Sequence, residues 1–299
     1  MKSLVCFILS LSVLTGCGVK EQSEKLDVDV KEEQNEKVVA TQEVKPRIKI
    51  INKEGTVLAQ RFNVPKGYRR IETEEGSFAR YLRSLELKPH GSKVLFYNGS
   101  TKENRGVYEA VVNMDIGKKN LQQCADAIMR LRGEYLYGRG DYDEIHFNFT
   151  NGFRVDYSKW IEGYRVKVNG NNTSYIKKSQ KSNTYNDFRN YMELIFMYAG
   201  TLSLSKELEA VDLENMQIGD VFIQGGSPGH AVIVVDMAVG NKSDKKLFML
   251  AQSYMPAQDI QILANPKDDD MSPWYPLEDV ETIVTPEWTF NKDNLKRFR

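Results

Sequence analysis

Cys124 and His230 are the two residues of this chain best suited to nucleophilic chemistry. Cys124 falls near the start of a predicted helix, "NLQQCADAIMRLRGEYLYG", where the positive end of the backbone dipole lowers the pKa of a thiol. His230 stands where the glycine-rich loop Gly225–Gly229 enters a run of β-branched residues. A thiolate attacks a carbonyl when a histidine takes and returns its proton and a third polar group orients the imidazole. The two residues therefore predict a Cys/His pair for acyl-group chemistry.

Both residues also have structural interpretations. Cys124 shares an apolar helical stripe with Leu121, Ile128 and Leu131, where a free cysteine is usually a small buried hydrophobe. His230 could be a histidine that only starts a strand and bonds to the backbone of the loop before it. The pattern of residues leaves the catalytic and the structural interpretation open.

Composition and motifs favour neither nucleic-acid binding nor a metal site. Lysine plus arginine equals aspartate plus glutamate at 41 each, so no net field attracts a polyanion. His90, in "KPHGS", and His146, on the polar side of an alternating stretch, lack partners at metal-ligand spacing. The loop "GGSPG" lacks the Gly-Lys-Ser/Thr ending of a phosphate loop and predicts a hairpin connection. We expect no metal, no cofactor and no nucleic-acid partner.

Residues 1–16 have the pattern of an export signal. Lys2 precedes an apolar run from Leu4 to Leu14, which is too short to span a membrane as a mature helix. The stretch Leu14-Thr15-Gly16-Cys17 resembles the bacterial lipobox, which implies cleavage before Cys17 and lipidation of its thiol. Acyl chains on Cys17 would anchor the protein to a membrane, because each buried methylene contributes about 0.8 kcal/mol. An uncleaved membrane anchor is the alternative interpretation.

Residues 17–46 are predicted to form a disordered charged tether behind the lipid. The segment mixes both charges and holds no aromatic residue, so it cannot bury enough apolar area to offset its ordering entropy. In a flexible regime it would keep the globular part roughly 30 Å from the anchor. A short exposed helix around residues 32–39 is the alternative. Cys6 leaves with the signal and Cys17 carries lipid, so Cys124 is the thiol of the folded part.

Residues 47–299 are predicted to form a single globular α+β domain with helices packed on an antiparallel sheet. Its N-terminal portion, to residue 116, reads as β-rich with one helix that begins after the N-cap residue Ser77. The three tryptophans are expected in the aromatic core rather than along a groove. The other expected elements are helices over 120–138 and 185–200, a half-buried strand over 145–150, and a meander of strands from 218 to 263 joined at 225–229.

The stretch "IGDVFIQGGSPGHAVIVVDMA" followed by "LFMLAQSY" resembles the second half of NlpC-type, papain-like cell-wall peptidases. Gly219 and Asp220 match a turn that opens a strand in that family, and His230 matches the start of the next strand. Gln252 matches the third polar group, one strand further on. The resemblance covers about forty residues. It implies a papain-like core that hydrolyses cell-wall peptide amides, with Cys124 as nucleophile, His230 as base and Gln252 as the orienting group.

The chain departs from this family at the nucleophile. In NlpC-type enzymes the nucleophile opens the helix just before the Gly-Asp turn, but here that helix, "YNDFRNYMELIFMYAG", has no cysteine. Either the Cys124 helix plays that part, with residues 139–215 as a large insertion, or the fold survives without its nucleophile. The second alternative is a non-catalytic module that binds an envelope partner or a wall fragment.

Motifs along the whole chain resemble those of a bacterial lipoprotein family catalogued as domain of unknown function 4846. The resemblance implies a lipid-anchored protein of the bacterial cell envelope and brings no established activity. The motifs are "LKPHGSKV", "NLQQCADA", "YAGTLSL", "GGSPGHAV", "LAQSYMPAQD", "SPWY" and "TPEWTF".

Overall fold

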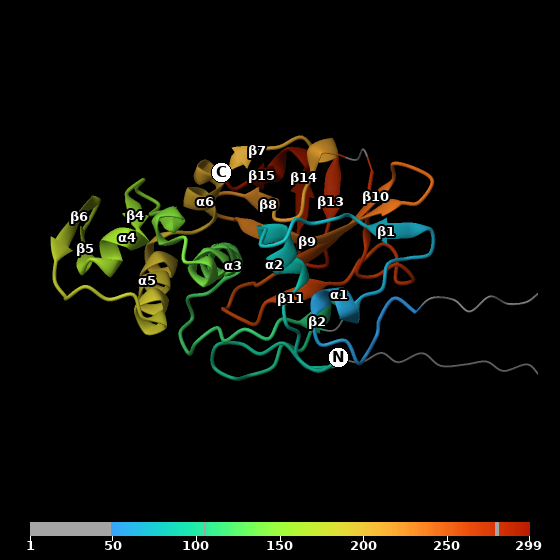
Figure 1. Ribbon diagram of the computed structural model, residues 1–299, viewed down its shortest axis with the longest axis horizontal. Helices are drawn as coiled ribbons and strands as arrows, with labels where there is room; N and C mark the ends of the chain where they lie inside the picture. Colours follow the sequence, from blue (N-terminus) through green and yellow to red (C-terminus); the bar gives the residue numbers. More distant parts are fainter. Residues whose placement is uncertain (1–48, 105, 279–280) are drawn as a thin grey trace, which may run out of the picture. The chain divides into compact units, whose positions relative to one another are not determined.

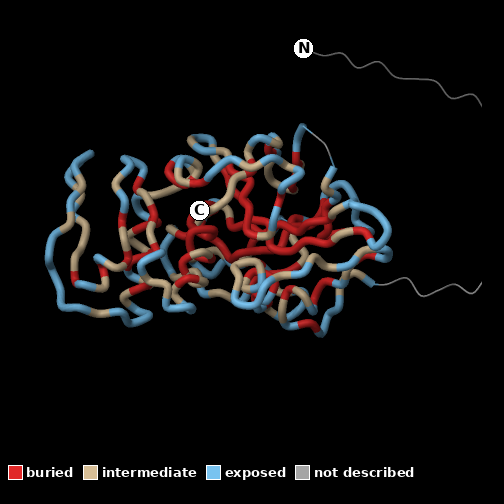
Figure 2. Tube along the Cα trace, turned by 45° about the horizontal axis from the view of Figure 1, so that its top comes forward, coloured by how far each residue is buried: buried red, intermediate tan, exposed pale blue. Residues whose placement is uncertain are grey.

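The longest run of β-branched and apolar residues forms strand β9 (His230–Gly240), which is buried along almost its whole length. Residues Ile233 and Val235 pack into one hydrophobic cluster, and Val232 and Val234 pack into a second. Because successive side chains of a strand point to opposite faces, both faces of the sheet are covered at β9. Figure 2 shows this buried centre in red. The double burial explains why β9 reads as a continuous apolar run rather than an alternating one.

A nine-stranded antiparallel sheet is built around β9 in the part of the chain that the structure describes, residues 49–104, 106–278 and 281–299. The computed structural model is therefore α+β, as predicted (Figure 1). The main path of the sheet is β2 (Tyr108–Val111), β11 (Gln261–Leu263), β10 (Lys246–Gln252), β9, β8 (Val221–Gln224), β15 (Leu295–Arg297) and β7 (Glu209–Ala210), with β1 (Tyr68–Arg70) on β9 and β12 (Tyr275–Leu277) on β10.

Helix α3 (Cys124–Arg139) packs directly on β9 and is the helix on which the other long elements converge. It contacts α2, α5 and α6 as well as the sheet, so its polar positions Asp126 and Arg130 are buried together with its apolar ones. Figure 1 shows α3 between the sheet and the α4–α5 region. The remaining helices are α1 (Leu58–Arg61), α2 (Phe78–Arg83), α4 (Tyr157–Ile161), α5 (Tyr185–Tyr198) and α6 (Thr201–Glu207).

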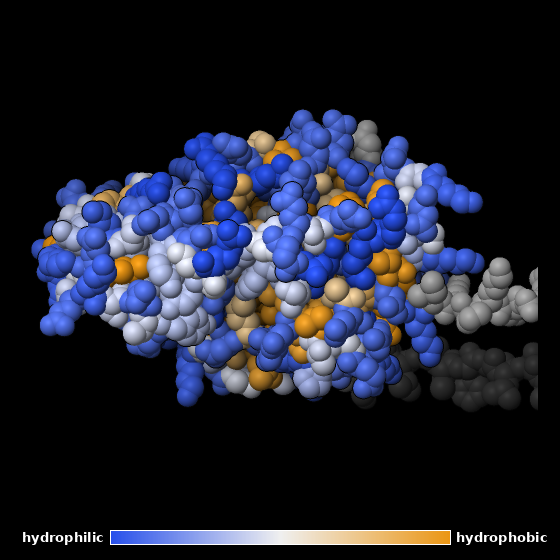
Figure 3. Space-filling model, in the orientation of Figure 1, coloured by the Kyte–Doolittle hydropathy of each residue, from blue (hydrophilic) through white to orange (hydrophobic). Residues whose placement is uncertain are grey.

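Small two-stranded hairpins lie outside this central sheet. Two of them bury their central residues on the core, whereas no residue of the third, at residues 164–177, is buried. The space-filling view shows a mostly hydrophilic face with small apolar areas (Figure 3). These hairpins are β3–β4 (His146–Asn148 with Arg154–Asp156), β5–β6 (Tyr164–Asn169 with Asn172–Lys177) and β13–β14 (Thr282–Val284 with Thr289–Asn291). Short 3-10 turns occur at Tyr142–Glu144, Leu213–Asn215 and Lys292–Asn294.

Three predicted helix boundaries can be compared with local chemistry, and one is confirmed while two are displaced. Ser77 caps α2 as predicted, because its side chain accepts a hydrogen bond from the Arg80 backbone N–H. Helix α3 begins at Cys124 rather than after Asn120, because the Asp126 carboxylate accepts from the Gln123 backbone N–H and fixes the N-terminus there. Gly140, with φ 78°, ends the helix two residues later than predicted.

The β-rich reading of residues 47–116 was largely wrong. Only β1 and β2 are strands among the described residues of this portion, and "RIKIIN" and "KVLFYNG" make single bridges. The backbone finds other partners: the Leu95 N–H, for example, donates to the Asp259 carboxylate rather than to a neighbouring strand. Helix α6 and strand β6 were not predicted.

Strand β9 carries a buried carboxylate, Asp236, which is 0% exposed. Its two oxygens accept hydrogen bonds from the Nε atoms of Arg70 and Arg83, each at 2.7 Å. These two arginines lie on β1 and at the end of α2. The cluster ties both elements to the middle of the sheet, because a buried charge needs its partners.

The signal, Cys17 and tether predictions lie outside the described residues. Within the described ranges, no helix is both long enough and apolar enough to cross a membrane. Contacts group residues 47–299 as one compact unit.

Candidate active site

Cys124 is the first residue of α3 and sits where that helix meets the beginning of β9. The backbone N–H groups of Ala125 and Ala231 lie close enough to the sulfur to lower the thiol pKa. Ala231 directly follows His230, so the helix start and the strand start bring the predicted nucleophile and base to one place. Solvent has little access to Cys124, which is 7% exposed.

His230 and Gln252 are hydrogen-bonded to each other, at 2.9 Å between Nε2 and Oε1. Antiparallel pairing produces this contact, because His230 begins β9 and Gln252 ends the neighbouring strand β10. Both residues are 1% exposed. A chain of further contacts follows: Gln252 Nε2 donates to Glu287 Oε2 at 2.6 Å, and Lys102 Nζ donates to the same oxygen at 2.6 Å.

The chain of contacts selects one tautomer of His230. Because the Gln252 amide nitrogen donates to the Glu287 carboxylate, the amide oxygen is the atom that faces the imidazole. That oxygen can only accept, so Nε2 of His230 carries the proton. Nδ1 is then the unprotonated nitrogen, the one able to take a proton from a thiol.

Two aromatic side chains border both Cys124 and His230. Trp288 lines the same pocket as Cys124, and its ring centroid lies 5.4 Å from the imidazole. Tyr254 lies 4.7 Å from the imidazole by centroid; burial raises its pKa, and the charges of Glu287 and of a Cys124 thiolate add to that rise. Between the described side chains of Cys124 and His230 themselves there is no direct hydrogen bond. The pair is adjacent but not engaged.

Burial dominates the protonation of both groups. It raises the pKa of the Cys124 thiol to about 11, with a smaller rise from Asp126, and it lowers the pKa of His230 to about 4. The expectation of a lowered thiol pKa is therefore wrong. Cys124 does open the helix, but desolvation of the thiolate outweighs the helix dipole and the N–H contacts, which act in the other direction. At neutral pH the resting pair is a thiol and a neutral imidazole.

This state predicts slow alkylation of native Cys124. At pH 7.5 its rate with iodoacetamide should be about 100-fold below that of an ordinary thiol, since a rise of about two pKa units removes that much thiolate. Because the thiol is an acid with a raised pKa, the rate should climb as pH approaches 11. Mass spectrometry of the labelled peptide containing Cys124 measures it, with urea-unfolded protein as the control. Labelling that occurs only in denaturant would contradict an accessible site.

Cys124 opens onto a pocket of about 320 Å³. The lining has no lysine, arginine, histidine or glutamate, and it comes from the α3 start, the α5–α6 corner and the 226–229 loop. The residues are Asn120, Leu121, Gln123, Cys124, Ala125, Asp126, Phe196, Ala199, Gly200, Thr201, Gly226, Ser227, Pro228, Gly229, Met255 and Trp288. Burial raises the pKa of Asp126 to about 8, which leaves the pocket close to uncharged at neutral pH. It suits a small uncharged group beside the sulfur.

The tryptophans divide between core and pocket. Trp274 and Trp160 are buried in the core, as predicted, but Trp288 is only half-buried and borders both the pocket and His230. The residue reaches the site because the β13–β14 hairpin carries it there, next to Glu287. Neither Glu287 nor Lys102 was among the predicted site residues. The only local signal was the motif "TPEWTF", whose Pro-Glu-Trp forms the tip of that hairpin.

Gly219 and Asp220 have a structural role rather than a place in the pocket. Asp220 is 1% exposed, accepts from the Gln217 backbone N–H at 2.7 Å and pairs with Arg297. Gly219 has φ 100°, and a Cβ there would lie 3.0 Å from the Phe78 ring. The turn therefore fixes the approach to β8 without reaching the pocket.

The remaining histidines do not join this site. His146 lies in β3, where Nδ1 is 3.1 Å from the Glu144 carbonyl oxygen and Nε2 is 3.7 Å from Glu207. His90 is exposed in a turn. In the described part of the chain, no group of three or more histidine, cysteine, aspartate or glutamate side chains is arranged to hold a metal ion.

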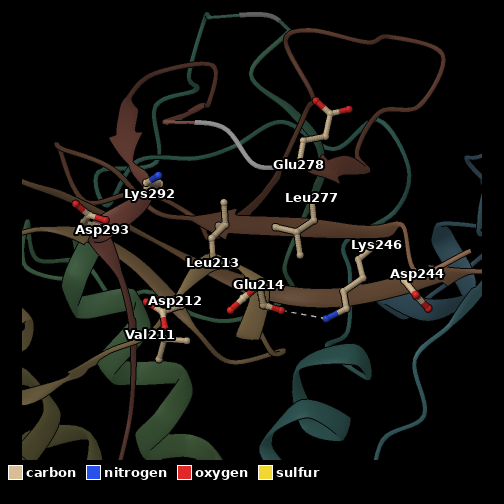
Figure 4. Close-up of a pocket in the computed structure, with 10 residues that line it drawn as sticks. All are labelled: Val211, Asp212, Leu213, Glu214, Asp244, Lys246, Leu277, Glu278, Lys292 and Asp293. Atoms are coloured by element: carbon tan, nitrogen blue, oxygen red, sulfur yellow. Dashed lines mark hydrogen bonds between the residues drawn. The ribbon is translucent and has the colours of Figure 1, made fainter.

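A second pocket lies at the far end of β10 and β12, away from Cys124 (Figure 4). It carries several carboxylates and two lysines, of which Lys246 donates to the Glu214 carbonyl oxygen at 3.1 Å. In Figure 4 the carboxylates of Asp244, Glu278 and Asp293 point in different directions rather than at one centre. The arrangement has no nucleophile and no shared ligand position.

Comparison with known proteins identifies a family but no characterised relative. No curated protein and no solved structure matches the chain. The profile of the family described as "Domain of unknown function (4846)" matches residues 58–297, which include the whole sheet from β1 to β15 and every residue of the candidate site. The chain therefore belongs to the family of domain of unknown function 4846.

Proposed function

We propose that this protein is a cysteine hydrolase with a papain-like core that cuts peptide amide bonds of the cell wall. One observation carries the proposal: a thiol at the start of the central helix adjoins the start of the strand that carries His230, and Nε2 of that histidine is bonded to Gln252. The three side-chain types and their order suit nucleophilic catalysis at a carbonyl. The choice of substrate rests on the sequence resemblance to NlpC-type peptidases.

The helix that supports this proposal is α3 rather than α5. Helix α3 packs on β9 with Cys124 at its N-terminus, whereas α5 packs on α3 and α4. Residues 139–215 would then be an insertion between the nucleophile helix and the β8–β9 hairpin. Under this proposal, Cys124 of α3 takes the place of the cysteine that the helix before the Gly-Asp turn lacks.

In the proposed reaction, substrate entry brings the scissile carbonyl to Cys124 as its sulfur gives a proton to Nδ1 of His230. The thiolate forms a bond to the carbonyl carbon, and the resulting oxyanion can be stabilised by backbone N–H groups of the first turn of α3. The C–N bond breaks as His230 returns the proton to the leaving amine. A water then hydrolyses the thioester, giving a carboxylate and the free thiol. Gln252 holds the imidazole throughout.

The raised pKa of Cys124 and its near-complete burial favour a second candidate function. In it the same pocket binds a wall fragment or an envelope partner without chemistry. One assay distinguishes the hydrolase from the binding module. Full-length protein incubated with purified peptidoglycan stem peptides should release a new amine and a new carboxylate, which mass spectrometry detects. Binding of intact peptides without cleavage would support the second candidate and contradict the first.

Glu287 is predicted to act as a positioning residue for the proposed hydrolase. Its carboxylate fixes the amide of Gln252 and raises the pKa of His230, so its loss should misorient the imidazole and lower that pKa further. Glu287→Ala should reduce kcat about tenfold or more with little change in KM. Glu287→Gln, which keeps an acceptor for Gln252, should retain more activity but shift the acidic limb of the pH–rate profile downward. Equal profiles for both variants and wild type would contradict this role.

The proposed location is the bacterial cell envelope, with a membrane anchor of lipid on Cys17. The support is the lipobox-like stretch and the similarity of the chain to a lipoprotein family, and the proposed partner of the globular part is a peptidoglycan peptide. Cys17→Ser should move the protein from the membrane fraction to the soluble fraction. Unchanged fractionation and an unchanged N-terminus would contradict lipidation.

A further inference from the structure

Arg132 is a half-buried residue of α3 that is surrounded by aromatic rings. Its guanidinium carbon lies 5.2 Å from the ring centroid of Phe78, 5.6 Å from that of Tyr135 and 5.4 Å from that of Phe298. Three rings around one cation cover much of its surface by cation–π contact. These contacts restrict the movement of the guanidinium before any ligand arrives.

The donors of Arg132 have no protein acceptor among the described residues. The nearby Arg130 shows the contrast, because it donates to Glu134, Gln122 and Tyr185 and to a backbone carbonyl. None of the Arg132 nitrogens is sealed from the surface, since none is among the fully buried unpaired atoms. Partial burial without an acceptor is costly for a charge, and it lowers the pKa of Arg132.

Arg132 lines a pocket of about 370 Å³ between α3, the β3–β4 hairpin and α6. Its charges are four cations, Arg132, Arg154, Lys206 and Arg299, against two carboxylates, Glu144 and Glu207. Two of these cations are already paired with carboxylates outside the lining, since Arg154 Nε lies 2.6 Å from Asp156 Oδ1 and Arg299 Nε lies 2.8 Å from Glu209 Oε1. Arg132 is therefore a cation of the pocket whose donors stay open to a ligand.

We propose that this pocket binds a small ligand through an oxyanion, a phosphate or carboxylate group held in the plane of Arg132. A guanidinium whose faces are covered presents its N–H donors at the edge, the geometry that pairs with two oxygens of one anion. Lys206 adds charge at the rim without fixed geometry. The pocket volume fits a small molecule or a single headgroup rather than a folded partner.

The oxyanion pocket is separate from the Cys124 site. Arg132 lies eight positions along α3 from Cys124, about 12 Å along the helix axis. The two pockets share no lining residue. Evidence against the proposed hydrolase would not contradict the oxyanion pocket. Evidence against the oxyanion pocket would not contradict the hydrolase.

Titration calorimetry of the full-length protein with inorganic phosphate, at ionic strength matched with sodium chloride, tests the proposal. Phosphate should bind saturably, and Arg132→Gln should weaken it at least about tenfold, with Arg132→Lys in between because it keeps the charge but loses the fork. Lys206→Gln, which leaves the aromatic contacts intact, should weaken binding as well. Arg80→Gln is the matched control, because that exposed arginine lies outside the pocket and should bind phosphate as wild type does.

Two further arms identify the source of the anion. Acetate in place of phosphate tests a carboxylate ligand, and vesicles of phosphatidylglycerol against phosphatidylcholine test a lipid headgroup. Dependence on Arg132 in any arm supports the oxyanion pocket and names its ligand class. Absence of saturable binding in every arm, or equal affinity of wild type, Arg132→Gln and Lys206→Gln in correctly folded protein, would overturn it.

Discussion

Cys124→Ala should lower kcat/KM for hydrolysis of peptidoglycan stem peptides by at least about 10³-fold. The reason is that Cys124 supplies the only thiol among the described residues. The measurement is the initial rate of release of new amines by full-length protein, corrected for the uncatalysed reaction. Cys124→Ser keeps nearly the same shape and should be almost as inactive, because a serine hydroxyl has a far higher pKa than a thiol.

The fold should survive this change, which keeps the test interpretable. Cys124 sits at a helix start, and the hydrogen bond from Gln123 to Asp126 that fixes that start is independent of its side chain. Circular dichroism and thermal unfolding of both variants check this. His230→Ala should lose activity to a similar degree, and the double variant should lose little more, because the two groups act as a unit. Retention of activity in folded Cys124→Ala would contradict the proposed nucleophile.

Asp236→Ala should destabilise the protein by about 3–5 kcal/mol. The substitution leaves two arginines, Arg70 and Arg83, facing an apolar strand without the carboxylate that each contacts at 2.7 Å. Arg83 is the more damaging of the two, since its side chain is 8% exposed against 23% for Arg70. Urea unfolding of the full-length protein, followed by tryptophan fluorescence, measures the change.

Asp156→Ala is the matched control for Asp236. Asp156 pairs with Arg154 at 2.6 Å, a contact as short as those of Asp236, but on a surface hairpin with Arg154 55% exposed. Its loss should cost less than about 1 kcal/mol, since solvent screens an exposed pair. Equal destabilisation by the two substitutions would show that the Asp236 cluster contributes no more than a surface pair.

Patterns of local origin could be predicted from the sequence. The β-branched run after Gly229 predicts strand β9, the loop "GGSPG" predicts its hairpin with β8, and Ser77 predicts the start of α2. Each depends on residues close together in the chain. The core of the α+β fold follows from these elements, because the meander leaves an apolar face that helices must cover.

Features set by distant contacts could not be predicted in this way. Lys102 and Glu287 are 185 positions apart in sequence, yet Lys102 donates to the same Glu287 oxygen that accepts from Gln252. The raised pKa of Cys124 could not be predicted either. The position of the thiol at a helix start favours the thiolate, but the burial that raises its pKa depends on segments distant in sequence. Trp288 was expected in the core for its size, and only the β13–β14 hairpin places it at the pocket.

The most direct test of the Cys124–His230 pair is intact-protein mass spectrometry during turnover of a peptide substrate. The proposed mechanism predicts a transient mass increase equal to the acyl half of the peptide, localised to Cys124, absent in Cys124→Ala and formed far more slowly in His230→Ala. Cleavage without such an adduct, or an adduct on another residue, would contradict it. Intact peptide bound with no adduct on any variant would leave the protein as a wall-binding module.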